Sequence, residues 1–553
     1  MFKKIVVGGV VLLSILSGIF VYNKVSYVGE VVDPLIYFDE FNGNVNNLVY
    51  EDTRIDACEP IQIVDNKAYI SYDVANQYIN DRIFYDYNEK VLTLTTPKQI
   101  SRLYEGENKI NFGGHEGSYS IITLGDTLYI ETNLISDLFG VTIERGTDGR
   151  LFVATDTSKD QTIGTVHKKA QIRTHAARKS TVVEVLPRGS KVTIYSEADG
   201  FVRVRSENGI IGYLPEDNIK VQELKNAKNS TEQDTWEKNP LGETVRMMWD
   251  DMNNRADKDW SDTKYARMEN INVIAPVWFE FENADGSVSD IATESYVKEA
   301  HNRNIKVWPI LRHNLEEPSF TREILSSSDK RQKVINQLLE YAIQYNLDGI
   351  NVDIENIQDD FSKEWVQFMR ELYPQLKAKG LIVSVDVYAP SAWSGHYERE
   401  KIAESSDYFM VMAYDQYWSG SEEAGSVAEL PWTEAGIIAT LEEVPKEKLV
   451  LGIPFYSRLW KETSNGLETR AYSMDSVEEL IENWGVVPRL DEVSGQNYAE
   501  YNKDGEVYRI WIEDKDSVQK RLKLMEKYDL AGYAAWRLGY ETNDIWDILK
   551  DVE

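Results

Sequence analysis

The sequence predicts a mixed α/β protein whose C-terminal part is a (β/α)8 barrel, a closed barrel of eight parallel strands. Two observations carry this prediction. From residue 240 to residue 553, short apolar strands alternate with helical stretches, which is the pattern of parallel β/α units. This stretch of roughly 310 residues suits one such barrel. Residues 30–157 repeat a strand–helix–strand order and residues 160–222 hold closely spaced short strands, so a small α+β domain and a small all-β domain precede the barrel.

The barrel strands are predicted at short apolar or alternating segments that are bounded by polar residues. They are residues 244–249, 273–279, 306–311, 349–355, 382–388, 408–414, 449–454 and 531–536. An additional segment, about 461–513, separates the last two and contains one further strand at 505–511. We expect this insertion to wall one side of a cleft.

Residues 30–157 contain an internal repeat. Residues 66–79 are typical of a strand and a short helix, and residues 86–95 of a returning strand; residues 125–139 and 146–155 repeat this order. Turn residues fall at matching places in the two copies. The pattern resembles the stalk domain found at the N-terminus of copper amine oxidases, and the resemblance implies a spacer or a wall-interaction module.

Residues 160–222 hold short strands with turns at 187–190 and 197–200, as expected of a small all-β domain. The run resembles a bacterial SH3-like domain, a family that commonly binds cell-wall peptide. The family's usual N-x-R-S-G-P segment is replaced by residues 171–175. Wall binding and a purely structural role therefore both stay open.

The N-terminus predicts membrane attachment. Lys3 and Lys4 precede an apolar run over residues 5–22, which is at the short end of a membrane span. No small-residue cleavage site follows, so residues 1–25 are predicted to be an uncleaved signal-anchor in the cell membrane, with the rest of the chain outside the cell. The alternative is a cleaved signal peptide and secretion to the cell wall. Residues 223–239 are polar without periodicity and are predicted as a linker.

Charge and residue usage limit the classes of partner. The formal net charge is −32, and without a dense basic stripe the chain is not expected to bind nucleic acid. Capture by anionic lipids or anionic wall polymers is also disfavoured, whereas an uncharged sugar polymer is compatible. Cys58 is the only cysteine and the six histidines are scattered, so no intrachain disulfide, metal or other cofactor is predicted.

The segment 348–355, Asp-Gly-Ile-Asn-Val-Asp-Ile-Glu, is the most informative part of the chain. Strand alternation places Asn351, Asp353 and Glu355 on one face and apolar residues on the other. A strand that is apolar on one side and acidic on the other suits a barrel interior near its catalytic rim. Since burying two acids is costly without a purpose, we interpret the pair as glycan-cleaving carboxyl groups.

Four motifs in order resemble glycoside hydrolase family 18. Residues 348–355 resemble its D-G-x-D-x-D-x-E signature, residues 412–415 its M-x-Y-D, and residues 452–460 its G-x-P-x-Y-x-R-x-W. Trp536 matches the tryptophan that ends the eighth strand of the family's barrel. The whole layout looks most like the peptidoglycan N-acetylglucosaminidases that are linked to bacterial spore cortex and germination.

The resemblance implies retaining, substrate-assisted hydrolysis, in which the acetamido oxygen of the sugar attacks the anomeric carbon and forms an oxazolinium ion. Glu355 is then the acid and base, Asp353 accepts the acetamido N–H, and Tyr414 holds the acetamido oxygen. Substrate-binding residues are predicted at Trp536, Asp415, Asn351, Met412, Trp278 and Arg458. For the tryptophans at 278, 393, 418 and 460, ordinary barrel packing is the alternative role.

Three positions of the signature have other expected roles. Asp348 has the opposite strand parity from the acidic face, so Asp348 and Gly349 are predicted to be structural. Asn351 stands where chitinases carry an aspartate that shares a proton with the next one. We therefore expect Asp353 to have a hydrogen-bonding neighbour but no carboxyl neighbour, and the pH profile to differ from that of a chitinase.

The predicted function is cleavage of β-1,4 bonds after N-acetylglucosamine in peptidoglycan, by an exported enzyme. One alternative is a chitinase or chitobiosidase that acts on chitin oligomers. The other is a non-catalytic, glycan-binding surface protein, although Glu355, which inactive relatives typically lose, is retained. Endo and exo action both stay open.

Overall fold

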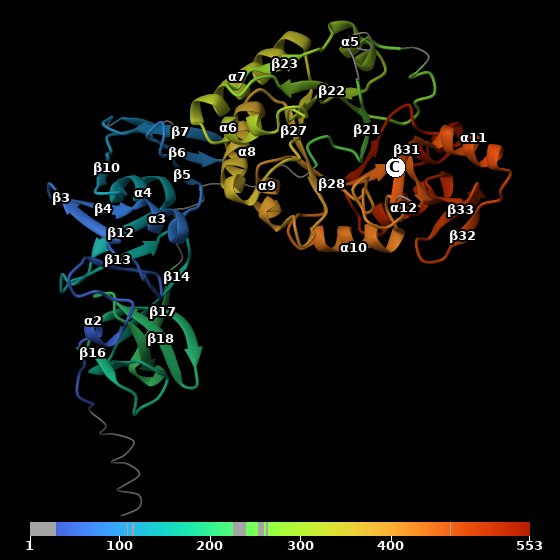
Figure 1. Ribbon diagram of the computed structural model, residues 1–553. Coiled ribbons are helices and arrows are strands. Elements are labelled where there is room, and N and C mark those ends of the chain that lie inside the picture. The colour runs from blue at the N-terminus through green and yellow to red at the C-terminus, as the bar shows by residue number, and fades with distance from the viewer. Residues whose placement is uncertain are drawn as a thin grey trace, which may run out of the picture. The chain divides into compact units, whose positions relative to one another are not determined.

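The computed structural model describes residues 29–107, 109–112, 115–224, 239–252, 259–261, 264–464 and 466–552 (Figure 1). The predicted signal-anchor and most of the predicted linker lie outside these residues. Within the described part of the chain, no helix is long and apolar enough to cross a membrane. The chain forms two compact units, which divide after Tyr85, after Ile100 and after Gln233. Residues 86–100, assigned by sequence to the stalk domain, group with the second unit.

The second unit contains the predicted (β/α)8 barrel. Its strands are β21 (Val245–Asp250), β22 (Val273–Phe281), β24 (Lys306–Val307) with β25 (Ile310–Arg312), β26 (Gly349–Asp353), β27 (Ile382–Tyr388), β28 (Tyr408–Met412), β29 (Leu449–Pro454) and β35 (Gly532–Trp536). Each strand pairs in parallel with the next, and pairing of β21 with both β35 and β22 closes the sheet. The predicted fold class is therefore confirmed.

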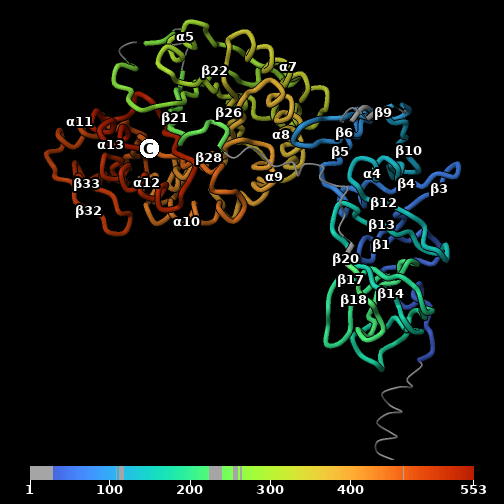
Figure 2. The backbone as a smooth tube through the Cα atoms, turned by 180° about the vertical axis from the view of Figure 1, so that it is seen from behind, coloured from blue at the N-terminus to red at the C-terminus, as the bar shows by residue number. Residues whose placement is uncertain are grey.

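Helices surround the barrel (Figures 1 and 2). They are α5 (Glu294–Asn302), α6 (Ser319–Leu325), α7 (Ser328–Tyr345), α8 (Ser362–Lys377), α9 (Arg399–Glu404), α10 (Leu430–Leu441), α12 (Lys515–Lys527) and α13 (Trp546–Leu549). Local sequence sets their ends. The Ser327 side chain accepts the Lys330 N–H at the start of α7, and Asn346 ends this helix in the left-handed conformation, which asparagine adopts more readily than most residues.

Two apolar cores hold the barrel. The larger lies between the strands and the helices, and includes Trp278, Ile350 and Val352. The smaller fills the barrel interior, where the rings of Trp308 and Tyr408 stack at 5.7 Å. Because strand residues alternate between these cores, Ile350 and Val352 face the helices, and the residues between them face the interior.

The insertion between β29 and α12 is a small α+β element. It comprises β30 (Tyr456–Thr463), β31 (Gly466–Ser473), α11 (Met474–Trp484), β32 (Arg489–Asp491), β33 (Gln496–Lys503) and β34 (Glu506–Ile512). The strands form one antiparallel sheet in the order β31-β30-β34-β33-β32. It therefore begins near Tyr456, before the predicted residue 461, and has more strands than the single predicted one.

The first unit contains an all-β part and the repeat without residues 86–100, which group with the second unit. Each repeat gains a strand over the prediction, because β5 (Ile83–Asp86) and β12 (Val141–Arg145) form hairpins with β6 (Val91–Thr96) and β13 (Leu151–Asp156). The other elements up to residue 131 are α2 (Pro34–Tyr37), β1 (Asn47–Tyr50), β2 (Thr53–Arg54), β3 (Ile61–Val64), β4 (Lys67–Ser71), α3 (Tyr72–Val74), β7 (Gln99–Tyr104), β8 (Ile110–Phe112), β9 (His115–Gly117), β10 (Ile121–Leu124) and β11 (Thr127–Glu131). Helix α4 (Thr132–Phe139) follows β11.

The all-β part is a seven-stranded antiparallel sheet, as predicted for residues 160–222. Its strands are β14 (Gln161–Val166), β15 (Ala170–Arg173), β16 (Val182–Leu186), β17 (Lys191–Ala198), β18 (Phe201–Ser206), β19 (Ile211–Pro215) and β20 (Ile219–Leu224). Its core is built from alternating valine, leucine and isoleucine side chains.

Candidate active site

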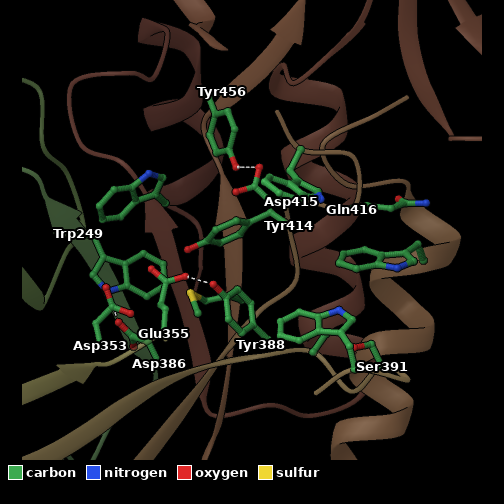
Figure 3. Close-up of a pocket in the computed structure, with 16 residues that line it drawn as sticks. Trp249, Asp353, Glu355, Asp386, Tyr388, Ser391, Tyr414, Asp415, Gln416 and Tyr456 are labelled. Atoms are coloured by element: carbon green, nitrogen blue, oxygen red, sulfur yellow. Dashed lines mark hydrogen bonds between the residues drawn. The ribbon is translucent and has the colours of Figure 1, made fainter. Parts of the chain in front are cut away.

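A cavity of about 750 Å³ opens at the carboxyl ends of the barrel strands (Figure 3). Four acidic side chains line it: Asp353, Glu355, Asp386 and Asp415. The other lining residues are mostly aromatic, and among the described residues no lysine or arginine lines the cavity. The site is therefore an acidic and aromatic cleft, suited to an uncharged ligand with apolar faces.

The predicted acids meet in this cleft. Strand β26 ends at Asp353, and Glu355 follows two residues later on the same side. Burial raises the pKa of the Asp353 carboxyl well above its ordinary value, and the charges of Glu355 and Asp386 raise it further. In the described part of the chain, Asp353 Oδ1 is buried without a hydrogen-bond partner. An unsatisfied buried acceptor facing a cavity is a place for a ligand donor.

Glu355 is held by its side chain and its backbone. The Tyr388 hydroxyl donates to its carboxylate, the Tyr397 hydroxyl donates to its carbonyl oxygen at 2.6 Å, and its N–H donates to His313 Nδ1 at 3.3 Å. Burial raises the pKa of the Glu355 carboxyl; the Tyr388 hydrogen bond lowers it, and the charge of Asp415 raises it. The net upward shift favours a proton donor.

Tyr414 and Asp415 follow β28 at the cleft wall. Asp415 has a positive φ of 57°, and its carboxylate accepts the Tyr456 hydroxyl at 2.7 Å and lies 3.4 Å from Arg458 Nη2. The Tyr414 ring packs edge-on against Trp249, with centroids 6.5 Å apart. Tyr414 and Asp415 both line the cleft, whereas Arg458, which lies beside Asp415, is not a lining residue.

Tryptophans form the floor and the rim of the cleft. Trp536, at the end of β35, packs against Trp249 with ring centroids 6.2 Å apart, and both line the cavity. Trp393 and Trp418 also line it, yet their side chains are 60% and 56% exposed. Two large exposed rings beside an acidic cleft are unusual for packing residues and are available to stack on a ligand.

Several predicted site residues lie elsewhere. Trp278 is 2% exposed and packs against Tyr296 in the core between strands and helices, so the structure does not bring it into the cleft. Trp460 is buried, and its Nε1–H donates to the Gly425 carbonyl at 2.7 Å. Asn351 is fully buried below the cleft. Met412 lines the cavity as predicted.

Asp348 and Gly349 lie at the opposite end of β26 from the cleft. The Asp348 carboxylate accepts the Val307 N–H at 3.0 Å and pairs with His301 and Lys306. A Cβ atom at Gly349 would lie 2.6 Å from the Ile382 carbonyl oxygen, a contact that only glycine avoids. These contacts join neighbouring strands and do not reach the cleft.

Sequence reasoning missed Asp386, and the expectation that Asp353 has no carboxyl neighbour is wrong. Asp386 lines the same cleft from β27, and its charge acts on Asp353. The signal was present: Ser384, Asp386 and Tyr388 alternate with valines along residues 382–388, just as the acidic face of β26 alternates. Tyr388 belongs to the same alternating face and was missed with Asp386, whereas Trp249 was missed because it ends a mainly apolar segment.

Comparisons with known proteins agree with this geometry. Residues 279–541 match the family "Glycosyl hydrolases family 18", and residues 168–220 match the "Bacterial SH3 domain". The uncharacterized glycosylase YvbX of Bacillus subtilis is 24% identical over 294 residues, covering 51% of this chain and 84% of that protein. A cortical fragment-lytic enzyme of Bacillus subtilis is 23% identical over 251 residues, covering 43% of this chain and 58% of that protein. The chain thus spans little more than half the length of the second relative.

The fold has solved counterparts. A chitinase from Chromobacterium violaceum ATCC 12472 superimposes with a TM-score of 0.50 at 22% identity, over 56% of this chain and 98% of the chitinase chain. The family match covers most of the barrel and every acidic residue of the cleft, and it begins after strand β21. Residues 279–541 therefore form a domain that matches glycoside hydrolase family 18, and residues 168–220 before it match a bacterial SH3 domain.

Proposed function

We propose that this chain hydrolyses β-1,4 bonds after N-acetylglucosamine by retaining, substrate-assisted catalysis, with Glu355 as the acid and base. One observation carries the proposal: the cleft places the unpartnered buried oxygen of Asp353 beside a carboxyl group, Glu355, whose pKa is raised. The Asp353 oxygen is an acceptor for an acetamido N–H, and Glu355 keeps its proton to a higher pH than an ordinary glutamate does.

The reaction runs in two steps on a bound N-acetylglucosamine unit. In the first, the acetamido oxygen attacks the anomeric carbon, the glycosidic C–O bond breaks, and Glu355 gives its proton to the leaving oxygen. Asp353 accepts the acetamido N–H and stabilises the positive oxazolinium ion. In the second, Glu355 removes a proton from water, the water oxygen bonds to the anomeric carbon, and the oxazolinium ring opens. Tyr414 orients the acetamido oxygen throughout.

The proposed substrate is peptidoglycan rather than chitin. The name of the cortical fragment-lytic relative and the SH3 domain favour a wall glycan, and we extend this to a wall- or membrane-associated location outside the cell. The acidic lining of the cleft and the net charge of −32 would repel anionic groups that such a glycan carries near the bond that is cut. Chitin oligomers are the second candidate, because the cleft has exposed tryptophans and the fold is also that of a chitinase.

Mass spectrometry of digests tests both the activity and the substrate. The full chain and its Glu355→Gln variant are incubated with spore-cortex peptidoglycan, vegetative peptidoglycan and N-acetylglucosamine oligomers. Reducing N-acetylglucosamine ends from a peptidoglycan, absent with the variant, are the expected result. Cleavage of the oligomers alone would make the enzyme a chitinase, and no cleavage of any glycan would favour the glycan-binding alternative.

A further inference from the structure

A buried polar cluster lies directly below the cleft. Asn351 Nδ2–H donates to Asp386 Oδ1 at 2.8 Å and to Ser384 Oγ at 3.0 Å. Trp249 Nε1–H is shared between Asn351 Oδ1 at 3.0 Å and Asp386 Oδ2 at 3.1 Å. Asp386 is only 3% exposed. Two donors therefore fix its carboxyl group in one orientation without neutralising its charge.

The strand register brings Asp386 beside Asp353. Strands β26 and β27 run parallel with Asn351 opposite Ser384 and Val352 opposite Val385. The next residues along the two strands are Asp353 and Asp386, and adjacent strands are about 4.8 Å apart. Figure 3 shows the two carboxyl groups close together at one side of the cleft, and both line it.

Two carboxyl groups on adjacent strands of a buried site repel each other when both are ionised, which favours a state in which one of them keeps a proton. Arg312 lies opposite Asp353 in the pairing of β25 with β26. Its guanidinium group, however, forms an ion pair with Glu280 at 2.6 Å. Asn351 has no proton to share, since an amide does not titrate in this range. The acid that could share a proton with Asp353 comes instead from the neighbouring strand.

We propose that Asp386 is the proton-holding partner of Asp353, a positioning residue that replaces the carboxyl group absent at Asn351. In the resting site the pair carries one proton and one negative charge. When Asp353 accepts the substrate's acetamido N–H, the proton stays on Asp386, so that Asp353 meets the oxazolinium ion as an anion. No proton enters or leaves the pair. This role rests on the proposed function, because it serves the same reaction.

Amide substitutions separate this role from simple packing. Asp386→Asn keeps the side-chain size, and Trp249 Nε1–H retains Asn351 Oδ1 as its acceptor. We expect kcat/KM on N-acetylglucosamine oligomers or peptidoglycan to fall about 100-fold. The double variant Asn351→Asp, Asp386→Asn returns a carboxyl group to the cluster and should recover at least a tenth of the wild-type value. Ser384→Ala, which touches Asn351 but removes no acid, is the matched control and should stay within about threefold.

Infrared titration of protonated carboxyl groups provides a readout that needs no turnover. Burial raises the pKa of Asp386 to about 8, so the wild type should lose a protonated-carboxyl band near that pH. The charge of Glu355 adds to this upward shift, so Glu355→Gln should lose the same band at a lower pH. Folded Asp386→Asn should lack this titration, and Ser384→Ala should keep it. An unchanged titration, or an unchanged kcat/KM, in folded Asp386→Asn overturns the proposal. Absence of any Glu355-dependent hydrolysis defeats the proposed function instead, and the titration still decides the role of Asp386.

Discussion

At the scale of single residues, the proposed reaction depends on the proton of Glu355. A general acid works only while protonated, so activity falls as the pH rises through its pKa. Burial raises that pKa, which moves the alkaline limb of the pH–rate profile above the ordinary range of a glutamate. Tyr388 opposes the shift, because its hydroxyl stabilises the carboxylate form.

Replacing Glu355 by Gln removes the proton donor. We expect kcat to fall at least about 1,000-fold, within the range of positioned general acids, while the thermal midpoint stays the same or rises because a buried carboxyl group is lost. Glu340→Gln, on the exposed face of α7, is the control and should keep full activity. Reducing-end release and thermal unfolding measure the two effects; an active Glu355→Gln enzyme contradicts the assignment.

Tyr388→Phe tests how Glu355 is tuned. Loss of the hydroxyl removes a hydrogen bond that favours the ionised form, so the pKa of Glu355 should rise and the alkaline limb of kcat/KM should move to higher pH. Tyr397→Phe removes a hydroxyl that donates to the Glu355 carbonyl oxygen and not to its carboxylate, and it should leave that limb in place. A shift to lower pH in Tyr388→Phe would show that the hydroxyl does not stabilise the carboxylate.

Residue types and spacing were enough to find Asp353, Glu355, Tyr414 and Trp536. They were not enough for Asp386, because its importance comes from the register between two strands, which one strand's alternation does not contain. The prediction that Trp278 binds substrate was wrong for a related reason. Alternation along β22 places its side chain on the helix side of the sheet, where it packs in the larger core.

At the scale of elements, the loops after β27 and β28 carry the exposed rings of the cleft. Trp393 packs edge-on against Tyr388 with centroids 5.0 Å apart and remains 60% exposed. Trp393 and Trp418 line the same cleft as Glu355. Their rings are suited to stacking on sugar units beyond the one being cut.

Trp393→Ala and Trp418→Ala should each raise KM for long oligomers about tenfold, equivalent to roughly 1.4 kcal/mol. The effect on disaccharide-length substrates should be smaller, because they do not reach both rings. Stability should change little for such exposed side chains. Val487→Ala, 91% exposed in the insertion, is the surface control. Equal losses on short and long substrates would argue against a stacking role.

The elements were predictable to different degrees. The barrel strands were found because they are short apolar runs or, at residues 349–355 and 382–388, segments that alternate apolar and polar residues. Most strands of the insertion were not, since β31 alternates between exposed and half-buried residues and has few apolar side chains. Such a strand is stabilised by its partners in the antiparallel sheet and leaves a weak pattern in the sequence.

At the scale of the whole molecule, we expect the net charge to affect which glycans are hydrolysed. A net charge of −32 and an acidic cleft repel anionic polymers, and salt screens this repulsion. We expect kcat/KM for uncharged N-acetylglucosamine oligomers to be nearly independent of ionic strength. For glycan strands that carry anionic peptides it should rise several-fold between 0.02 M and 0.2 M salt, two conditions that span the screening range. A fall with added salt would reveal a cationic contact outside the described lining.

The measurement that tests the central claim most directly is the anomeric configuration of the first product, followed by proton NMR before mutarotation. Substrate-assisted hydrolysis through an oxazolinium ion inverts the anomeric carbon twice, so the account predicts that the β-anomer of the new reducing N-acetylglucosamine end forms first. Appearance of the α-anomer first would mean a single inverting displacement by water and would contradict the roles given to Asp353 and Glu355.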